Sequence, residues 1–169
     1  LFRSADLGTG SGAIALALAA ERPQIEVTAT DASPAALEIA RANAARLGLG
    51  NVGFACGDWC AALTGCFALI ASNPPYLAEA DAHLDRGDLR FEPRTALAAG
   101  ADGLADLRRI IDSAAEHLAP GGWLLLEHGH DQGESVPTLL RAAGYHEVEC
   151  VTDLAGRPRV SLGRMAQEQ

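Results

Sequence analysis

The sequence predicts an α/β protein: a doubly wound, mostly parallel sheet with helices on both faces. Two patterns carry this prediction. Short apolar segments of strand length alternate with helix-like patterns along the chain. A glycine-rich turn, Gly8-Thr9-Gly10-Ser11-Gly12, lies between the first predicted strand and the first predicted helix. The 169 residues suit one domain, and no repeat, low-complexity segment or internal linker divides them.

The first half of the chain alternates strands with helices. The predicted strands are 2–7, 25–30, 52–55 and 67–71, and the predicted helices are 13–21 and 34–47. The first helix is apolar almost all round, which predicts that it is buried. In the second helix Ser33 is a typical N-cap, Pro34 suits the first position, and Gly48 ends the helix. Its predicted apolar stripe is Leu37, Ala40, Ala44 and Leu47.

The second half continues the alternation after an irregular stretch. Residues 77–100 show no sustained period and hold several charges, which is typical of a functional lid. Within them we expect Glu92 and Arg94 to tie the segment down through an ion pair or a cap. A long amphipathic helix is predicted over 104–118, ended by Pro120-Gly121-Gly122. The remaining predicted elements are strands 123–127, 145–151 and 159–162, and helix 136–143.

Composition narrows the class of protein. The net charge of −9 lacks the basic residues from which a duplex nucleic-acid binder builds its phosphate-contacting face. No run approaches the roughly 20 apolar residues of a membrane span, and no signal segment opens the chain. The cysteines show no paired spacing typical of zinc, so we expect reduced packing residues in a cytoplasmic protein. They are Cys56, Cys60, Cys66 and Cys150.

The glycine-rich turn predicts a cofactor site. Glycines there let the backbone approach a ligand that any Cβ would push away. Asp31 ends the next predicted strand, where a carboxylate can accept both hydrogens of a ribose diol. Two ligands fit this pattern, S-adenosylmethionine and a dinucleotide, because Gly8-x-Gly10-x-x-Ala13 also matches a dinucleotide fingerprint. The third glycine, Gly12, favours S-adenosylmethionine.

Asp58-Trp59, after the third predicted strand, strengthens the same interpretation. Trp59 can stack on an adenine, and Asp58 or a neighbouring backbone group can bind the adenine edge. The structural alternative is a tryptophan that closes the edge of the core.

The second candidate site is Asn73-Pro74-Pro75-Tyr76, hereafter the acceptor motif. Both prolines lack an N–H and restrict the preceding residue, which predicts a stiff loop at the end of a strand. The Asn73 oxygen and a nearby carbonyl are two acceptors, enough to hold an NH2 group by both hydrogens. Tyr76 offers an aromatic face to a planar group. The alternative is an ordinary proline-rich turn with a buried tyrosine.

His128-Gly129-His130 follows the fifth predicted strand and raises the question of a metal. No third ligand stands at a suitable spacing, so we expect no metal site.

Taken together, the glycine turn, Gly57-Asp58-Trp59, the acceptor motif and Phe91-Glu92-Pro93-Arg94 resemble those of the HemK family. These are the glutamine N5-methyltransferases that act on peptide chain release factors. The closing Asp153-Leu154-Ala155-Gly156-Arg157 narrows the match, which runs over essentially all 169 residues. The resemblance implies the class I methyltransferase fold, a Rossmann-like sheet of seven strands with an antiparallel last strand. The family also carries a helical N-terminal recognition domain, to which nothing here corresponds, so we expect residues 1–169 to be the catalytic domain alone.

The resemblance also implies roles for single residues. Gly8 to Gly12 would line the methionine and ribose of S-adenosylmethionine, Asp31 would hold the ribose hydroxyls, and Trp59 the adenine. The acceptor motif would hold the glutamine of a release factor's Gly-Gly-Gln tripeptide, with Asn73 also near the cofactor. The Asn73 oxygen and the Pro74 carbonyl would accept the two amide hydrogens and orient the nitrogen for methylation, leaving S-adenosylhomocysteine. We expect a monomer that binds neither nucleic acid nor membrane.

Four alternatives stay open from the sequence. A nucleic-acid N-methyltransferase acting on adenine N6 or guanine N2 shares the acceptor motif, but the charge of −9 disfavours it. A ribosomal-protein glutamine methyltransferase could share the same catalytic core. An NAD-dependent Rossmann enzyme would use the glycine turn differently. A non-catalytic binding domain fits least, because the cofactor and acceptor motifs both stand intact.

Overall fold

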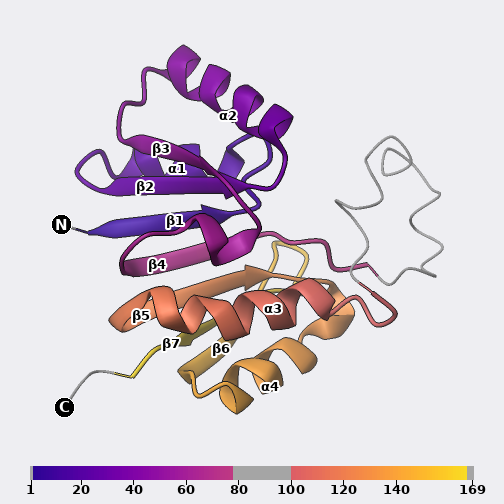
Figure 1. Ribbon diagram of the computed structural model, residues 1–169. Coiled ribbons are helices and arrows are strands. Elements are labelled where there is room, and N and C mark those ends of the chain that lie inside the picture. The colour runs from indigo at the N-terminus through magenta and orange to yellow at the C-terminus, as the bar shows by residue number, and fades with distance from the viewer. Residues whose placement is uncertain (1, 78–99, 167–169) are drawn as a thin grey trace.

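The computed structural model describes residues 2–77 and 100–166, whose strands form one seven-stranded sheet in the order β3-β2-β1-β4-β5-β7-β6 (Figure 1). Strands β1 to β5 run parallel, and β7 runs antiparallel between β5 and β6. The strands are β1 (Arg3–Leu7), β2 (Glu26–Asp31), β3 (Val52–Cys56), β4 (Phe67–Ser72), β5 (Leu118–Glu127), β6 (His146–Thr152) and β7 (Pro158–Arg164). The predicted mostly parallel α/β fold, with its antiparallel last strand, is confirmed.

Helices cover both faces of this sheet. In Figure 1, α1 lies behind the upper strands, whereas α3 and α4 lie in front of the lower ones. The α-helices of the described residues are α1 (Ala13–Glu21), α2 (Pro34–Leu47), α3 (Ala105–Ala114) and α4 (Ser135–Ala142). The core is divided accordingly: Ala15 and Ala19 of α1 pack with Val27, while Leu107 and Leu140 belong to a larger cluster on the other face. The doubly wound arrangement follows from this division.

Helix α2 begins and ends where its capping residues predict. The Ser33 hydroxyl accepts a hydrogen bond from the Ala36 N–H at 3.3 Å, and Pro34 occupies the first turn. Gly48 adopts a left-handed φ of 69°, and its N–H bonds back to the last turn. The predicted stripe is correct except at Leu47, which is 54% exposed. Helix α2 covers β2 and the edge strand β3, and no described strand lies beyond β3 to bury its last turn.

The prediction that α1 is buried all round is wrong. Ala15, Leu16 and Ala19 are buried, but Ala13, Ala17 and Ala20 are exposed. One face of α1 lies on the sheet and the opposite face points outward. A helix made almost entirely of Ala, Leu and Ile carries no polar stripe by which its outer face can be recognised.

The predicted helix over 104–118 ends too late. Helix α3 stops at Ala114, a 3-10 turn η5 (Ala115–His117) follows, and β5 has already begun at Leu118. Pro120-Gly121-Gly122 therefore lies inside β5, opposite a register shift between Phe67 and Leu69 of β4. Gly121 has a φ of 75°, and a Cβ on Gly122 would lie 2.9 Å from the Phe67 carbonyl oxygen. These residues form an irregularity within a strand, not a helix stop.

Further predictions are met only in part. Cys60 is buried, but Cys56 and Cys66 are exposed, so they are not packing residues. No helix within residues 2–77 and 100–166 is long and apolar enough to cross a membrane. The predicted lid, apart from its end residues Leu77 and Gly100, lies outside the described residues, as do Phe91-Glu92-Pro93-Arg94 and the predicted role of Glu92 and Arg94.

Gly48→Ala is expected to destabilise the protein by about 1 kcal/mol, because an L-residue is disfavoured in the left-handed region that ends α2. No atom lies within 4 Å of the added methyl group, so the cost is one of backbone conformation. Gly50→Ala is the matched control: it also meets nothing within 4 Å, and its φ is not left-handed. Urea unfolding of both variants measures the difference. Equal midpoints would contradict this account of the helix end.

Candidate active site

Parallel pairing of β1 with β4 brings the two candidate sites together. Leu7 is the register partner of Ser72, and the Ser72 hydroxyl donates a 2.8 Å hydrogen bond to the Leu7 carbonyl. Gly8 and Asn73 are the next residues of their strands. The glycine turn and the acceptor motif therefore leave the sheet at the same edge, where the carboxyl ends of β1 and β4 meet.

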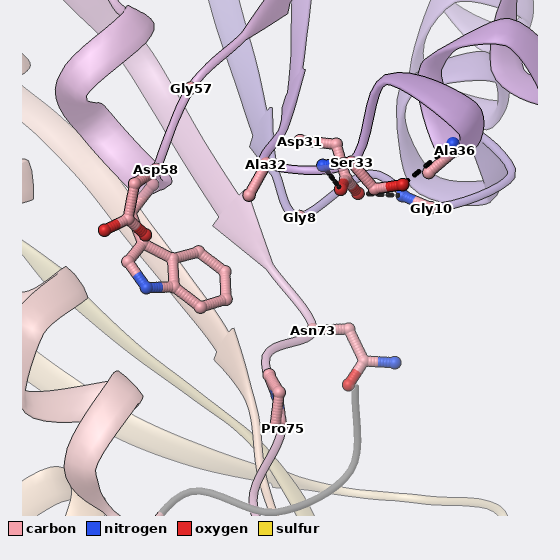
Figure 2. Close-up of a pocket in the computed structure, with 11 residues that line it drawn as sticks. Gly8, Gly10, Asp31, Ala32, Ser33, Ala36, Gly57, Asp58, Asn73 and Pro75 are labelled. Atoms are coloured by element: carbon pink, nitrogen blue, oxygen red, sulfur yellow. Dashed lines mark hydrogen bonds between the residues drawn. The ribbon is translucent and has the colours of Figure 1, made fainter. Parts of the chain in front are cut away.

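A cavity of about 460 Å³ opens at this edge, within the size range of small-molecule sites. Figure 2 shows Asn73 on one side of it, Asp58 on another, and Asp31 beside Gly10 of the glycine turn. The lining residues are Gly8, Gly10, Asp31, Ala32, Ser33, Ala36, Gly57, Asp58, Trp59, Asn73 and Pro75. Residues from the ends of four adjacent strands therefore share one cavity.

The glycine turn requires glycine at Gly8 for two reasons. Its φ is 67°, and a Cβ would lie 2.9 Å from the Trp59 ring. Gly10 is also left-handed, with a φ of 55°, and its N–H donates to the Asp31 carboxylate at 2.9 Å. Backbone thus lines this part of the cavity, with no side chain between it and a ligand.

Asp31 is held from two sides. One carboxylate oxygen accepts from the Gly10 N–H, and the other accepts from the Ser33 N–H at 2.8 Å. These bonds fix the carboxylate between the glycine turn and the start of α2 while it still lines the cavity. Each carboxylate oxygen has lone-pair capacity left for a hydroxyl donor.

Trp59 has a strained backbone. Its φ of 47° is rare for a residue other than glycine, and such conformations concentrate at ligand sites. The Thr30 hydroxyl donates to the Trp59 carbonyl at 3.2 Å and helps to hold this conformation. The indole is half-buried and lies against Gly8, on the cavity wall.

Asp58 lines the cavity, and its carboxylate is paired with the Arg109 guanidinium of α3. Both side chains are more than half exposed, so this ion pair adds little to stability. The pairing occupies part of the carboxylate that the sequence suggested for the adenine edge.

Several predicted site residues do not line the cavity. The Thr9 hydroxyl donates to Asp6, and the Ser11 carbonyl accepts from Asn43. Gly12 is the buried N-cap of α1. Within the acceptor motif Asn73 is exposed and Pro75 half-buried on the cavity wall, whereas Pro74 is buried and Tyr76 packs against the larger core cluster.

Asp6 is a charged residue beneath the glycine turn, 1% exposed. Its Oδ2 accepts from the Thr9 hydroxyl at 2.6 Å and from the Ala15 N–H at 3.0 Å. Its Oδ1 has no hydrogen-bond partner among the described residues. Burial raises the pKa of Asp6 to about 6, and the nearby Asp31 charge adds to the rise, while the hydrogen bonds from Thr9 and Ala15 oppose it.

His128 is fully buried and links the end of β5 to Ser161 of β7 by a hydrogen bond, whereas His130 is exposed. His128 Nδ1 lies 2.8 Å from the Gly129 carbonyl oxygen, and Nε2 lies 2.7 Å from the Ser161 hydroxyl. A carbonyl can only accept, so Nδ1 carries the proton. Burial lowers the pKa of His128. Among residues 2–77 and 100–166, no cluster of three or more acidic, His or Cys side chains could hold a metal ion.

A family model described as "Methyltransferase small domain" matches residues 2–89, more than half of the chain. The chain belongs to this family.

The relatives of this methyltransferase domain have a consistent name. This chain is 59% identical over 163 residues to the release factor glutamine methyltransferase of Xylella fastidiosa (strain Temecula1). The match covers 96% of this chain and 59% of the relative. The protein of that name from Escherichia coli K12 is 51% identical over 166 residues, covering 98% and 60%. The methyltransferase domain thus spans about three fifths of the length of the curated relatives it matches.

Solved structures confirm the fold. A methyltransferase from Pyrococcus furiosus superposes with a TM-score of 0.73 at 21% identity, covering 96% of this chain and 74% of that one. A 16S rRNA methyltransferase of Thermus thermophilus, solved with AdoMet and guanosine, gives a TM-score of 0.70 at 21% identity, covering 96% and 37%. At this identity the likeness shows the methyltransferase fold alone.

Sequence reasoning missed some residues of the site. Ala32 and Ser33 line the cavity, although Ser33 was interpreted only as a helix cap. Both follow Asp31 at the same strand end, so their position could have been predicted. Gln132 and Gly103, which contact the Tyr76 carbonyl, carry no such local signal.

Asp6→Asn is expected to change how stability depends on pH. Wild-type Asp6 has a folded pKa of about 6, raised above the ordinary value of 3.8 for an aspartate, so the native state binds its proton more tightly than the unfolded chain. Its contribution is therefore full below pH 4 and is lost as the pH rises to about 6, a change of roughly 3 kcal/mol. The amide cannot ionise, so the variant lacks this component. Denaturation of both proteins from pH 4 to 7 tests this, and parallel profiles would contradict it.

Proposed function

We propose that this chain is the catalytic part of an S-adenosylmethionine-dependent protein glutamine methyltransferase. Its substrate is the side-chain amide nitrogen, N5, of the glutamine in the Gly-Gly-Gln motif of peptide chain release factors. The names of relatives at 51–59% identity support this assignment. Because the chain spans about three fifths of those relatives, the activity of the whole protein is part of the proposal.

One observation carries the catalytic part of the proposal: Asn73 lines the same cavity as Gly8, Gly10 and Asp31. A group bound over the glycine turn therefore lies within the cavity that Asn73 borders. A stiff acceptor loop turned away from the glycine turn would have left the two motifs without a common ligand.

The cavity fits S-adenosylmethionine in size and in chemistry. Its volume of about 460 Å³ suits a nucleoside-sized ligand, and the backbone at Gly8 and Gly10 leaves room where a side chain would stand. Gly8 to Gly12 are proposed to form the turn around the methionine and ribose, Asp31 to hold the ribose hydroxyls, and Trp59 to stack on the adenine. In the bound state, S-adenosylmethionine supplies a methyl group on a cationic sulfonium.

The acceptor motif overcomes the weakness of the substrate nitrogen. An amide nitrogen is a poor nucleophile because its lone pair is delocalised into the carbonyl. The Asn73 oxygen accepts one N–H and the Pro74 carbonyl the other, which moves electron density toward nitrogen and fixes its orientation. The role proposed for Pro74 is that of its carbonyl oxygen, because its ring has no hydrogen-bonding group.

No side chain has to act as a strong base in this proposal. The hydrogen bonds to Asn73 and Pro74 strengthen as the nitrogen becomes cationic, so they stabilise the transition state more than the ground state. The methylated nitrogen then releases a proton to water.

We further propose that a helical domain preceding this chain recognises the release factor. The share of the relatives that this chain leaves uncovered is compatible with such a domain. A monomeric state and a cytoplasmic location are part of the same proposal.

Trp59→Ala is expected to weaken S-adenosylhomocysteine binding by about 1–3 kcal/mol, the value of one base–aromatic stacking contact. The chain has one other tryptophan, Trp123 of β5, which does not line the cavity. Trp123→Ala is therefore the matched control. Calorimetry measures the affinity of both variants for S-adenosylhomocysteine. Equal affinities would contradict the proposed role of Trp59 in cofactor binding.

The central test uses the full-length protein, S-adenosylmethionine and a purified release factor. Mass spectrometry is expected to find one added methyl group on the glutamine of the tripeptide. Methylation of DNA, ribosomal RNA or a ribosomal protein instead, measured in parallel, would overturn the proposed substrate. Tight NAD binding without S-adenosylmethionine binding would overturn the proposed chemistry.

In the same assay, Asn73→Ala is expected to lower turnover by about 10²–10³-fold, as the loss of one oriented hydrogen-bonding group does in other enzymes. S-adenosylhomocysteine binding to the variant shows that the cavity is intact. Near-normal turnover would exclude the proposed role of Asn73.

A further inference from the structure

Gln132 is a buried amide that ties the acceptor motif to the other half of the sheet. It ends the 3-10 turn η6 (His130–Gln132) after β5 and is 7% exposed. Its Nε2 donates to the Tyr76 carbonyl at 3.0 Å and to the Gly103 carbonyl at 3.3 Å. Its Oε1 accepts from the Gly129 N–H at 2.9 Å. Both ends of the amide are therefore engaged with backbone.

The contacts of Gln132 require a glycine at position 103. Gly103 has a φ of 70°, and a Cβ there would collide with the Tyr76 carbonyl and lie 3.0 Å from Gln132 Nε2. Glycine thus lets this backbone approach both partners closely. The segment entering α3, the turn after β5 and the end of the acceptor motif meet at one point.

The Tyr76 ring is held by packing. It lies against the larger core cluster, near Arg159 of β7, whose guanidinium donates to the His128 carbonyl at 3.2 Å. Burial, and then the charge of Glu127, raise the pKa of Tyr76, and Arg159 opposes the rise. The Tyr76 carbonyl is therefore held by Gln132 after β5, and its ring is held by packing on the core.

These anchors matter for Asn73 because the motif between them is stiff. Pairing of β4 with β1 fixes the residue before Asn73, and Gln132 fixes the residue that ends the motif. The two prolines in between have restricted backbones. Fixing both ends of such a segment fixes the backbone from which the exposed Asn73 side chain projects toward the cavity.

We propose that Gln132 is a positioning residue for methyl transfer: by holding the Tyr76 carbonyl, it keeps Asn73 aimed into the cavity. This inference rests on the proposed function. Gln132 does not line the cavity and acts only through the acceptor motif. Its loss should therefore lower kcat while leaving cofactor affinity unchanged.

Gln132→Glu tests this with little change of shape. The carboxylate still accepts from Gly129, but an oxygen replaces the NH2 group and faces two carbonyl oxygens. A displacement of the motif by about 1 Å is expected to lower kcat for the glutamine substrate by about 10–100-fold. Calorimetry with S-adenosylhomocysteine gives both the affinity and the fraction of folded sites, to which kcat is normalised.

Asn51→Asp is the matched control. The Asn51 amide also donates to two backbone carbonyls, Ala19 at 3.2 Å and Ile25 at 3.1 Å, but it immediately precedes β3, at the end of the sheet opposite the cavity. The same chemical change there should lower stability without lowering kcat per folded site. This separates a positioning role from a general loss of packing.

The outcomes distinguish this inference from the proposed function. An inactive wild type contradicts the proposed function. An active wild type together with unchanged kcat in Gln132→Glu, or in the uncharged Gln132→Met, overturns the inference alone. Loss of cofactor binding in both variants, under conditions where Asn51→Asp still binds, also overturns it, because Gln132 would then support the whole fold. Reduced kcat with normal affinity supports it.

Discussion

The hydrogen-bonded pairing of β1 with β4 is the constraint on which the rest of the site depends. These strands are neighbours in the sheet although two α-helices, a 3-10 turn and two strands separate them along the chain. Their register, Leu7 beside Ser72, determines that Gly8 and Asn73 leave the sheet next to each other. The chain continues in opposite directions across the sheet from this point, to β2 and β3 on one side and to β5 on the other. A crevice at such a switch point is where parallel sheets bind ligands.

The two sides of the switch point contribute different parts of the candidate site. The β1–β3 side supplies the glycine turn, Asp31 and Trp59, and the hydrogen bonds that hold them come from that side. The acceptor motif directly follows β4, but its last residue is held by Gln132 from beyond β5. In our proposal the first side binds the cofactor and the second orients the substrate amide. A change on one side can therefore alter affinity without altering turnover, or the reverse.

This edge of the sheet holds a strained tryptophan, a turn of left-handed glycines and a buried carboxyl. Trp59 and the glycines of the turn have left-handed φ values, and Asp6 lies buried beneath them with one oxygen lacking a described partner. These features reduce the stability of the isolated domain, and hydrogen bonds from Thr9, Ala15 and Thr30 hold them in place. A strained backbone or a buried carboxyl persists in a folded protein only where the surrounding structure holds it in place. Such strain is typical of a preorganised ligand site.

The sequence by itself determined the features that neighbouring residues encode. The Ser33 cap, the Gly48 stop, the glycine turn and the proline-stiffened acceptor motif each depend on backbone preferences within a few residues. The outward face of α1 and the strand that contains Pro120-Gly121-Gly122 could not be predicted in this way, because packing on the sheet decided them. Only the tertiary structure showed Arg109 paired with Asp58 and Gln132 bonded to Tyr76, since partners more than fifty residues apart meet only when the strand order is set.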